Sequence, residues 1–415
     1  MAGDGITPPA ASGEQHERQP RASRRRKPRR RRPTTHHEEG VATLVDGLLF
    51  RKEDGKTYLL DPQATTSAGG PGVLVDDSLA SSCGLESGVL VAAKLQARNG
   101  RHRPTVVGLE SVEGLPLEEY RQRVSPFAEL LCIDPLERFH LETDAALLEP
   151  RAVELIAPIG RGQRCLIVAP PKAGKTILLQ QLAHAIATNH PETHIFVLLV
   201  DERPEEVTDW KRTLRRGEVW ASSTDKAMES HIEVSELVLE RARRLVELGE
   251  DVVVFVDSLT RMSRAYNNAQ KSSGRIMSGG IDARTMAKPR RFFGSARNLE
   301  DGGSLTIVAT CLVDTGSRMD EVIFQEFKGT GNTEIILSHE LFDRRVFPCI
   351  HISASGTRKE EKLYPRADVE KIFLLRRALA ALSPTEAMLA LLGRLKQFRT
   401  NAEFLDSIKA PNGRG

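Results

Sequence analysis

The sequence predicts an α/β domain built on a parallel sheet, preceded by a small all-β domain and a disordered basic tail. Three observations predict this fold class. Residues 1–38 lack apolar periodicity, the stretch that follows carries short β-type runs divided by turn residues, and the rest alternates apolar strand-like runs with helix-like stretches. A chain of 415 residues is long enough for two or three such domains.

The N-terminal tail is rich in Pro, Gly, Ser and Arg, and residues 21–32 alone contain nine basic side chains. Such a composition cannot bury enough apolar surface to offset the entropy lost on ordering, so we expect disorder. The formal charge of +3 would be negative without this block. A basic arm on an otherwise acidic chain favours a polyanionic partner such as nucleic acid, although a merely solvated tail is the alternative.

Residues 39–114 are predicted to form the all-β domain. Short runs at 42–45, 56–60, 73–75 and 89–94 are separated by Asp-Gly, Gly-Pro-Gly and Asn-Gly turns. About five short strands in such a segment suit a small closed barrel, of which the OB-fold is the common nucleic-acid-binding example. Residues 115–156 are predicted to be a linker with a helical piece.

Residues 157–415 are predicted to form the α/β domain. Apolar runs at 164–169, 194–200, 251–256 and 304–310 alternate with helix-like stretches. Runs that are apolar throughout indicate strands buried on both faces, which is typical of a parallel sheet with crossover helices.

A phosphate-binding loop follows the first of these strands. Residues 169–176 read Ala-Pro-Pro-Lys-Ala-Gly-Lys-Thr and precede a helix-like run. Gly174 lets backbone N–H groups face the phosphates, Lys175 reaches the β- and γ-phosphates, and the Thr176 hydroxyl binds Mg²⁺. The general pattern has Gly where this chain has Ala169, so the match is incomplete. The loop predicts ATP and Mg²⁺ as ligands.

Two carboxylates end neighbouring strand-like runs. Asp257 closes the run 251–256 and is the candidate metal-side acid, while Glu202 follows the run 194–200 and is the candidate base for the attacking water. The carboxyl ends of parallel strands share one edge of the sheet, so both should converge on the phosphate loop. A single Asp in such a place could equally cap a helix, but three features in this chain order favour a nucleotide hydrolase.

Cysteine and histidine usage argues against other classes of site. The cysteines are scattered and never in a Cys-x-x-Cys pair, so we expect neither disulfides nor zinc. His36 and His37 lack metal-ligand spacing. No apolar run approaches the ~20 residues of a membrane helix. We therefore expect a cytoplasmic protein with no membrane association.

These and further segments resemble the Rho family of bacterial transcription-termination helicases. The resemblance covers about 157–404 and rests on the segments 158–164, 169–176, 200–208, 257–261, 264–267, 279–280, 291–294, 314–321, 327–332 and 355–361. Their ordered series separates this family from its F1-ATPase and RecA relatives. It implies a RecA-like P-loop NTPase domain after a cold-shock-like OB-fold. It also implies a homohexameric 5′-3′ RNA helicase that couples ATP hydrolysis to pulling single-stranded RNA and releasing the transcript, with RNA polymerase and elongation factors as partners.

The resemblance also implies roles for single residues. Glu202 matches the catalytic base, Asp257 the metal-side acid with Thr176, Arg203 an arginine near the γ-phosphate, and Arg358 the finger that reaches the neighbouring subunit's site. Phe347 matches the residue that packs on adenine. The remaining nucleotide contacts implied by the match are Gly160, Arg161, Gly162, Gln163, Arg164, Cys165, Lys172, Ala173, Gly174, Lys175 and Ile177.

RNA contacts are implied in two places. The central pore of the ring would use Arg275, Ile276, Gly279, Gly280 and Arg318, with Arg at both basic positions where the family often has Lys. The primary site on the β-domain would use Phe50 and Arg51. Leu48 and Leu74 stand where the family has aromatic rings, which puts the cytosine preference in doubt because each stacked base contributes ~1–3 kcal/mol. We hypothesise that the basic tail compensates through phosphate contacts.

Two other functions remain open. A rotary ATPase subunit or a DNA-directed RecA-type motor would share the fold, but the β-type runs before the phosphate loop and Arg318 argue against both. An RNA-binding ring with degenerate ATPase chemistry is the second alternative. Intact Lys175, Thr176, Glu202, Asp257 and Arg358 argue against it.

Overall fold

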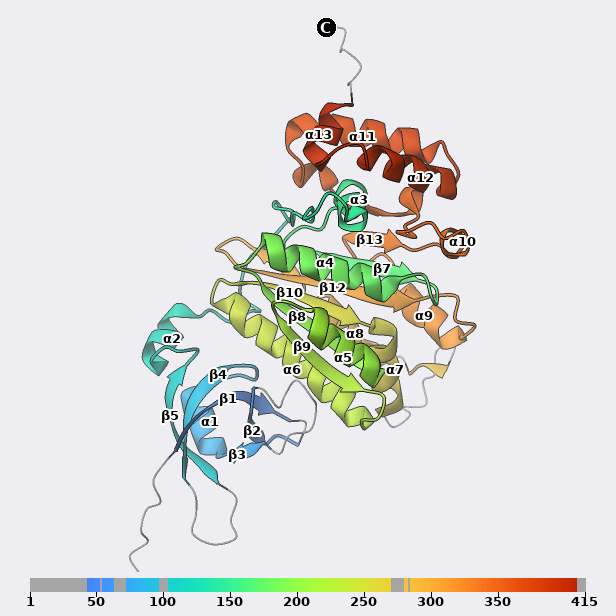
Figure 1. Ribbon diagram of the computed structural model, residues 1–415. Helices are drawn as coiled ribbons and strands as arrows, with labels where there is room; N and C mark the ends of the chain where they lie inside the picture. Colours follow the sequence, from blue (N-terminus) through green and yellow to red (C-terminus); the bar gives the residue numbers. More distant parts are fainter. Residues whose placement is uncertain are drawn as a thin grey trace, which may run out of the picture. The chain divides into compact units, whose positions relative to one another are not determined.

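The computed structural model describes residues 43–52, 54–62, 72–96, 104–269, 280–282 and 284–408. Within them the chain forms a five-stranded antiparallel sheet and a nine-stranded, mostly parallel sheet (Figure 1). The predicted order of an all-β domain followed by an α/β domain is thereby confirmed. The tail at 1–38 lies outside the described residues.

The β-domain has the strand order β3-β2-β1-β4-β5. Its strands are β1 (Thr43–Arg51), β2 (Thr57–Leu60), β3 (Val73–Val75), β4 (Leu90–Gln96) and β5 (Thr105–Val112), and each pairs antiparallel with its neighbours. Among the described residues no ladder joins β3 to β5, so the sheet is a half-barrel and not the closed barrel that we expected. The short β3 pairs along one edge only.

One helix of the β-domain was not anticipated from the sequence. Helix α1 (Asp77–Cys83) begins after Asp76, whose side chain accepts a hydrogen bond from the Ser78 N–H at 2.9 Å, and ends at Gly84 with φ 60°. Both are standard helix-end signals, but the segment has only seven residues and little apolar periodicity. Helix α2 (Leu117–Arg123) follows β5.

The segment 115–156 also supplies elements that pack on the α/β domain. Strand β6 (Cys132–Ile133) pairs with β11 (Arg297–Leu299), which itself pairs with the large sheet. Helix α3 (Leu148–Ile156) is buried from Pro150 onward. This segment, expected to be a linker with a helical piece, therefore contributes to the core of the second domain.

Six strands of the large sheet run parallel in the order β13-β7-β12-β10-β8-β9. They are β7 (Arg164–Ala169), β8 (His194–Glu202), β9 (Glu218–Ser223), β10 (Asp251–Asp257), β12 (Ser304–Leu312) and β13 (Thr333–Ile336). Strand β14 (Gly356–Thr357) adds an antiparallel edge to β13. The parallel sheet predicted from the apolar runs is confirmed.

The two faces of this sheet bury alternate residues of each strand in two separate cores. Cys165 and Ile167 of β7 pack with α3, α4 (Lys175–Asn189) and α5 (Pro204–Thr213), whereas Leu166 and Val168 pack with α6 (Met228–Glu247), α7 (Leu259–Ala269), α8 (Ala287–Phe293) and α9 (Arg318–Phe327). Because side chains alternate across a strand, a strand covered on both faces must be apolar at every position. This explains the uninterrupted apolar runs of the sequence.

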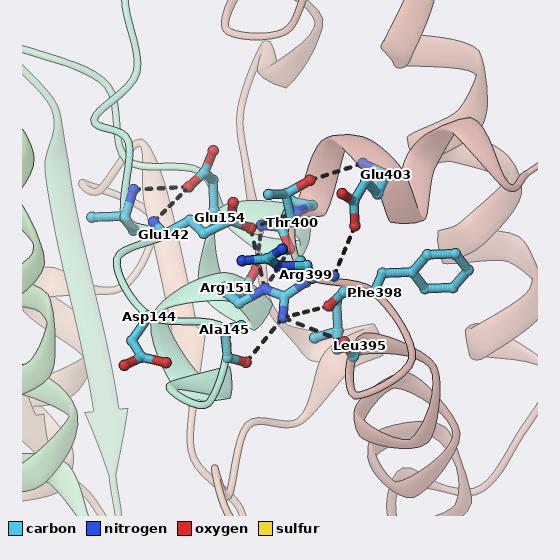
Figure 2. A network of polar contacts seen from close by, with 12 residues as sticks. Glu142, Asp144, Ala145, Arg151, Glu154, Leu395, Phe398, Arg399, Thr400 and Glu403 are labelled. Carbon is cyan, nitrogen blue, oxygen red and sulfur yellow. Dashed lines mark hydrogen bonds and ion pairs between the residues drawn. The ribbon is translucent and has the colours of Figure 1, made fainter.

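The C-terminal part of the chain is helical. After α10 (His339–Asp343) and the short 3₁₀ turns Ile352–Ala354 and Glu360–Lys362 come α11 (Arg366–Ala380), α12 (Pro384–Leu395) and α13 (Asn401–Asp406). The fully buried Arg151 of α3 attaches these helices to α3 (Figure 2). Its guanidinium donates hydrogen bonds of 3.1 to 3.3 Å to the backbone oxygens of Ala145, Leu395 and Phe398 and to the side chain of Asn401.

The β-domain contacts α6 closely through its backbone. Gly88 has φ +87°, and a Cβ built there would lie 2.4 Å from the carbonyl carbon of Glu240, so only glycine fits. Arg241 donates to the Gly88 oxygen at 3.2 Å and to Glu113 at 2.5 Å. The side chains of Arg241 and Glu113 are 12% and 5% exposed, so this ion pair is largely buried.

Candidate nucleotide and RNA sites

The three segments predicted to converge do meet at the carboxyl edge of the parallel sheet. Lys175 follows β7, and its Nζ lies 2.6 and 2.7 Å from the two carboxylate oxygens of Asp257 at the end of β10. The same Nζ lies 3.7 Å from Oε1 of Glu202 at the end of β8. The three side chains predicted to bind phosphate, metal and water therefore lie within reach of one another.

The phosphate loop has the backbone shape that anion binding requires. Lys172 and Gly174 both have positive φ, 67° and 83°, and α4 begins at Lys175 with no side chain capping its first turn. Its free N–H groups and the positive end of the helix are thus available to phosphate oxygens. Ala169, which departs from the usual glycine, is the last residue of β7 and has no positive φ, so this position does not need glycine.

An irregularity at the end of β8 turns the Glu202 side chain toward the protein interior. Val200 pairs with Ser222 and Glu202 with Ser223, which leaves Asp201 as an extra residue with φ 55°. Such a bulge turns the following side chain, and Glu202 is 1% exposed as a result. The generic strand pattern gives no sign of this bulge, because Asp201 and Glu202 are simply two acidic residues after an apolar run.

Arg261, on the first turn of α7, is a site residue that the sequence reasoning did not single out. Its Nε lies 3.2 Å from Glu202 Oε1, and its guanidinium also donates to the backbone oxygen of Asp201. It therefore holds both residues of the bulge. The available signal was its place in the segment 257–261, four residues after Asp257.

Burial and neighbouring charges shift the pKa values of Glu202 and Lys175. Burial raises the pKa of Glu202 to about 7, and the nearby Asp257 charge adds to this, while Lys175 and Arg261 partly oppose it. Burial by itself lowers the pKa of Lys175, but the charges of Asp257 and Glu202 outweigh it and the net pKa is raised. Lys175 therefore stays cationic, and Glu202 titrates near neutrality, as a general base should.

The residues present fit a nucleotide-bound Mg²⁺. Thr176 Oγ1 lies 3.4 Å from Lys175 Nζ, which itself contacts Asp257, so a hydroxyl and a carboxylate of the type that Mg²⁺ prefers lie in one place. Glu202 Oε1 is buried without a hydrogen-bond partner, which suits an atom that receives one from a water. No cluster of three or more His, Cys, Asp or Glu ligands occurs in the described ranges, and Mg²⁺ on a nucleotide needs few protein ligands.

Other predicted nucleotide residues lie on the same edge. Arg203 follows Glu202 directly and precedes α5. Ile177 and Phe347 are 61% and 45% exposed. Phe347 follows α10, which comes after β13, the neighbour of β7, and its partly exposed ring lies 6.1 Å from the ring of Phe342.

The turn from Gly160 to Cys165 lies at the opposite, amino edge of β7. There Gly160 N–H donates to Gln163 Oε1 at 2.8 Å, and a Cβ on Gly162 would lie 2.2 Å from Asn298 N. Arg358 is at this edge too, because its N–H donates to the Asn332 oxygen and the Asn332 N–H donates to the Arg164 oxygen, both at 2.8 Å. A six-residue strand spans roughly 17 Å. One chain therefore does not bring Arg358 to its own Lys175.

The residues predicted for the pore loops are connected to the catalytic elements. Arg318 is exposed and begins α9, and Gly280 accepts from Asn267 of α7 at 3.4 Å. Arg264 of α7 pairs with Asp320 of α9 at 2.9 Å. Helix α7 thus contacts Glu202 through Arg261, α9 through Arg264 and Gly280 through Asn267. Arg275, Ile276 and Gly279 lie outside the described residues.

The residues predicted for the primary RNA site differ in accessibility. Arg51 is exposed, whereas Phe50 and Leu48 are 4% and 3% exposed and belong to the same apolar cluster as Phe127. Leu74, which stands where an aromatic ring was expected, is 48% exposed. In this structure Phe50 therefore presents no open ring face for base stacking.

Comparison with known proteins now decides the family. The model of the ATP synthase alpha/beta family, nucleotide-binding domain, matches residues 150–357. Transcription termination factor Rho of Aquifex aeolicus is 47% identical over 377 residues, covering 90% of this chain and 86% of that protein. The chain belongs to the transcription termination factor Rho family.

Rho proteins of Micrococcus luteus and Streptomyces lividans are 47% and 50% identical to it, and the chain spans 53% and 51% of their length. Among solved structures, a type III secretion ATPase has a TM-score of 0.57 at 18% identity, covering 75% of this chain and 93% of that one. An ATP synthase subunit from Nanoarcheaum equitans has a TM-score of 0.55 at 15% identity, over 67% and 79%. These likenesses show that the chain shares the fold of these two proteins. None of the helices described is long and apolar enough to cross a membrane.

Proposed function

We propose that the chain is an RNA-dependent ATPase that assembles into a homohexameric ring, translocates 5′ to 3′ along single-stranded RNA in the cytoplasm and terminates transcription. One observation carries the proposal. The γ-phosphate position at Lys175 and the guanidinium of Arg358 lie at opposite edges of one sheet. A complete catalytic site therefore needs a second copy of the chain.

The charges at the amino edge support this interface. Arg164 lies close enough to Arg297 and Arg358 that their charges, after burial, lower its pKa. Within the described part of the chain, neither Arg164 nor Arg358 forms an ion pair with a carboxylate, and the side-chain hydrogen bonds of both go to backbone oxygens. Clustered cations without counter-charges suit an anion brought by a neighbour, and the nucleotide held by that neighbour's phosphate loop is such an anion.

In the hydrolytic step each residue has a separate task. Lys175 and the loop N–H groups bind the phosphates, Thr176 and Asp257 would hold Mg²⁺, and Glu202 orients a water molecule and takes its proton. The metal supplies electrostatic stabilisation of the charge that develops on the phosphoryl group. Arg358 of the adjacent copy adds a second positive charge at the same place.

RNA is coupled to this chemistry through α7. Its first turn positions Glu202 through Arg261, and Arg264 fixes it to α9, which starts at Arg318. A phosphate contact at Arg318 or Arg275 would shift this helix and, with it, the general base Glu202. Binding to nascent RNA, and to RNA polymerase and its elongation factors, belongs to the same proposal.

The decisive experiment measures ATP hydrolysis by the purified protein with poly(C), other RNA homopolymers, single-stranded DNA and no polymer. We expect hydrolysis that depends on Mg²⁺ and is stimulated by RNA more than by DNA. The Lys175→Ala variant serves as the inactive control. Stimulation by DNA alone, or RNA binding with no hydrolysis above that control, would refute the motor assignment.

A further inference from the structure

A cleft of about 1190 Å³ separates the β-domain from the nucleotide-binding domain. One wall is formed by β1, β2 and the region of α1, and the other by α6, α8 and the start of β11. Pockets for small ligands typically measure about 300–1000 Å³. The cleft therefore suits an elongated ligand that touches both domains.

Most charges in this cleft are already neutralised. Lys52 pairs with Glu233 at 2.7 Å, Arg243 with Glu240 at 2.8 Å, and Arg244 with Glu247 at 3.0 Å. The first pair links the β-domain to α6, and the other two lie within α6. Their cations have counter-charges and need no further anion.

Three arginines of the cleft remain without a carboxylate partner within the described ranges: Arg51 on β1, Arg291 on α8 and Arg297 on β11. Arg51 and Arg291 are exposed. The Arg297 guanidinium lies 4.4 Å from the centre of the Phe127 ring, and its Nε donates to the Ser295 oxygen at 3.2 Å, so it is held in place with its charge unopposed. The two walls thus present unpaired guanidinium groups to the same space.

We propose that this cleft binds the phosphodiester backbone of single-stranded RNA and leads it from the β-domain onto the nucleotide-binding domain through Arg51, Arg291 and Arg297. The inference rests on the proposed function and adds a contact region distinct from the pore loops. Guanidinium groups bind phosphates through paired N–H donors, and each such contact releases counterions from the nucleic acid.

The walls indicate contact with the backbone and not with the bases. The aromatic rings of the cleft belong to Phe50, Phe127, Tyr266 and Phe292. They are 3 to 6% exposed and present no open face for stacking. Binding in the cleft is therefore expected to be independent of sequence. RNA bound there would also bridge the interface at which Gly88 of the β-domain contacts α6 and Arg241.

The test compares two neighbouring arginines of α8. Arg291 lines the cleft and forms no ion pair with any residue that the structure describes, whereas Arg290 pairs with Glu326 at 2.9 Å and does not line the cleft. RNA affinity of the full-length protein is measured against salt concentration for the wild type, Arg291→Ala, Arg291→Lys and Arg290→Ala. Each lost phosphate contact lowers the slope of log affinity against log salt by about 0.7 for single strands. We expect that loss in Arg291→Ala only, with the slope restored in Arg291→Lys.

An unchanged slope in Arg291→Ala overturns the proposal, as does an equal change in Arg290→Ala. Thermal unfolding of each variant shows whether a changed slope reflects the loss of folded protein.

In a second experiment, inorganic tripolyphosphate is titrated at constant ionic strength. Binding that requires Arg291, combined with an unchanged RNA slope, would assign the cleft to free polyphosphates instead. RNA-stimulated hydrolysis by the wild type is scored separately, so failure of the cleft proposal is distinct from failure of the motor assignment.

Discussion

At the scale of single residues, the position of Glu202 in the fold sets the pKa of its carboxyl group. Its carboxylate faces one ammonium and one guanidinium group, at 3.7 and 3.2 Å, and such neighbours alone would lower its pKa. Burial and the adjacent Asp257 outweigh them, so the pKa rises to about 7. A carboxyl group with the usual pKa would be a poorer proton acceptor at neutral pH.

This predicts a pH dependence of catalysis. Because the pKa of Glu202 lies above the ordinary carboxyl value, the group is protonated at acidic pH and becomes a base only as the pH rises through about 7. The kcat of RNA-stimulated hydrolysis should increase with pH and level off above neutrality. One unit below the pKa it should be about tenfold lower than the plateau.

The measurement is kcat at saturating ATP and RNA between about pH 6 and pH 8, where a single proton acceptor sets the slope. The Glu202→Gln variant, which keeps the shape but cannot accept a proton, should be nearly inactive throughout. A flat wild-type profile with that variant inactive would show that another group limits the rate.

At the scale of elements, helix ends and turns were only partly predictable. The parallel strands follow from apolar runs because burial on both faces leaves no other pattern. Helix α1 was missed because it is short, and the bulge at Asp201 because one extra residue in a strand leaves no compositional mark. Gly88 and Gly162 could not be understood from the sequence, since what excludes a side chain there is backbone from distant segments.

The attachment of the C-terminal helices depends on Arg151 (Figure 2). The side chain is fully buried, pairs with Glu142 at 3.2 Å and donates to acceptors on α12, α13 and the loops beside them. Replacement by alanine would leave a cavity and several buried oxygens without a donor. Breaking a buried charge pair in this way typically costs about 3–5 kcal/mol.

We therefore expect Arg151→Ala to lower the free energy of unfolding by about that amount, measured by urea denaturation. The control is Arg399→Ala in the same region, since Arg399 is exposed and only its backbone N–H bonds to Glu403. That change should stay within about 0.5 kcal/mol of the wild type. Equal effects of the two substitutions would show that Arg151 does not hold these helices.

At the scale of the whole molecule, the catalytic residues that we propose are divided between two edges of one sheet. Lys175, Glu202 and Asp257 lie at the carboxyl edge, and Arg358 lies at the amino edge. The separation along β7 of roughly 17 Å is more than a guanidinium can span. Assembly is therefore part of the chemistry that we propose.

A complementation experiment tests this division. Arg358→Ala should still bind ATP but lose a factor of about 10³ to 10⁵ in turnover, and Glu202→Gln should also be inactive. Mixing the two inactive proteins under conditions that allow subunit exchange should restore part of the activity. Some interfaces then join an intact Glu202 from one protein to an intact Arg358 from the other.

The readout is RNA-stimulated hydrolysis of the mixture compared with each variant alone. A mixture of Arg358→Ala with the double variant Glu202→Gln, Arg358→Ala is the matched control, because it contains no intact finger. Recovery in the control, or none in the test mixture although exchange is verified, would refute a finger supplied by the neighbour.

The sequence by itself determined the order of the domains, the parallel sheet and the meeting of Lys175, Glu202 and Asp257. Each depends on local signals, namely apolar runs, a glycine-containing loop and carboxylates at strand ends, together with the rule that parallel strands end at one edge. Only the tertiary structure decided that Arg261 contacts Glu202, and that Arg358 and Lys175 lie at opposite edges of the sheet. It also decided that Arg291 lines a cleft without an ion pair to any described residue. These facts depend on contacts between segments far apart in the chain, which no local pattern records.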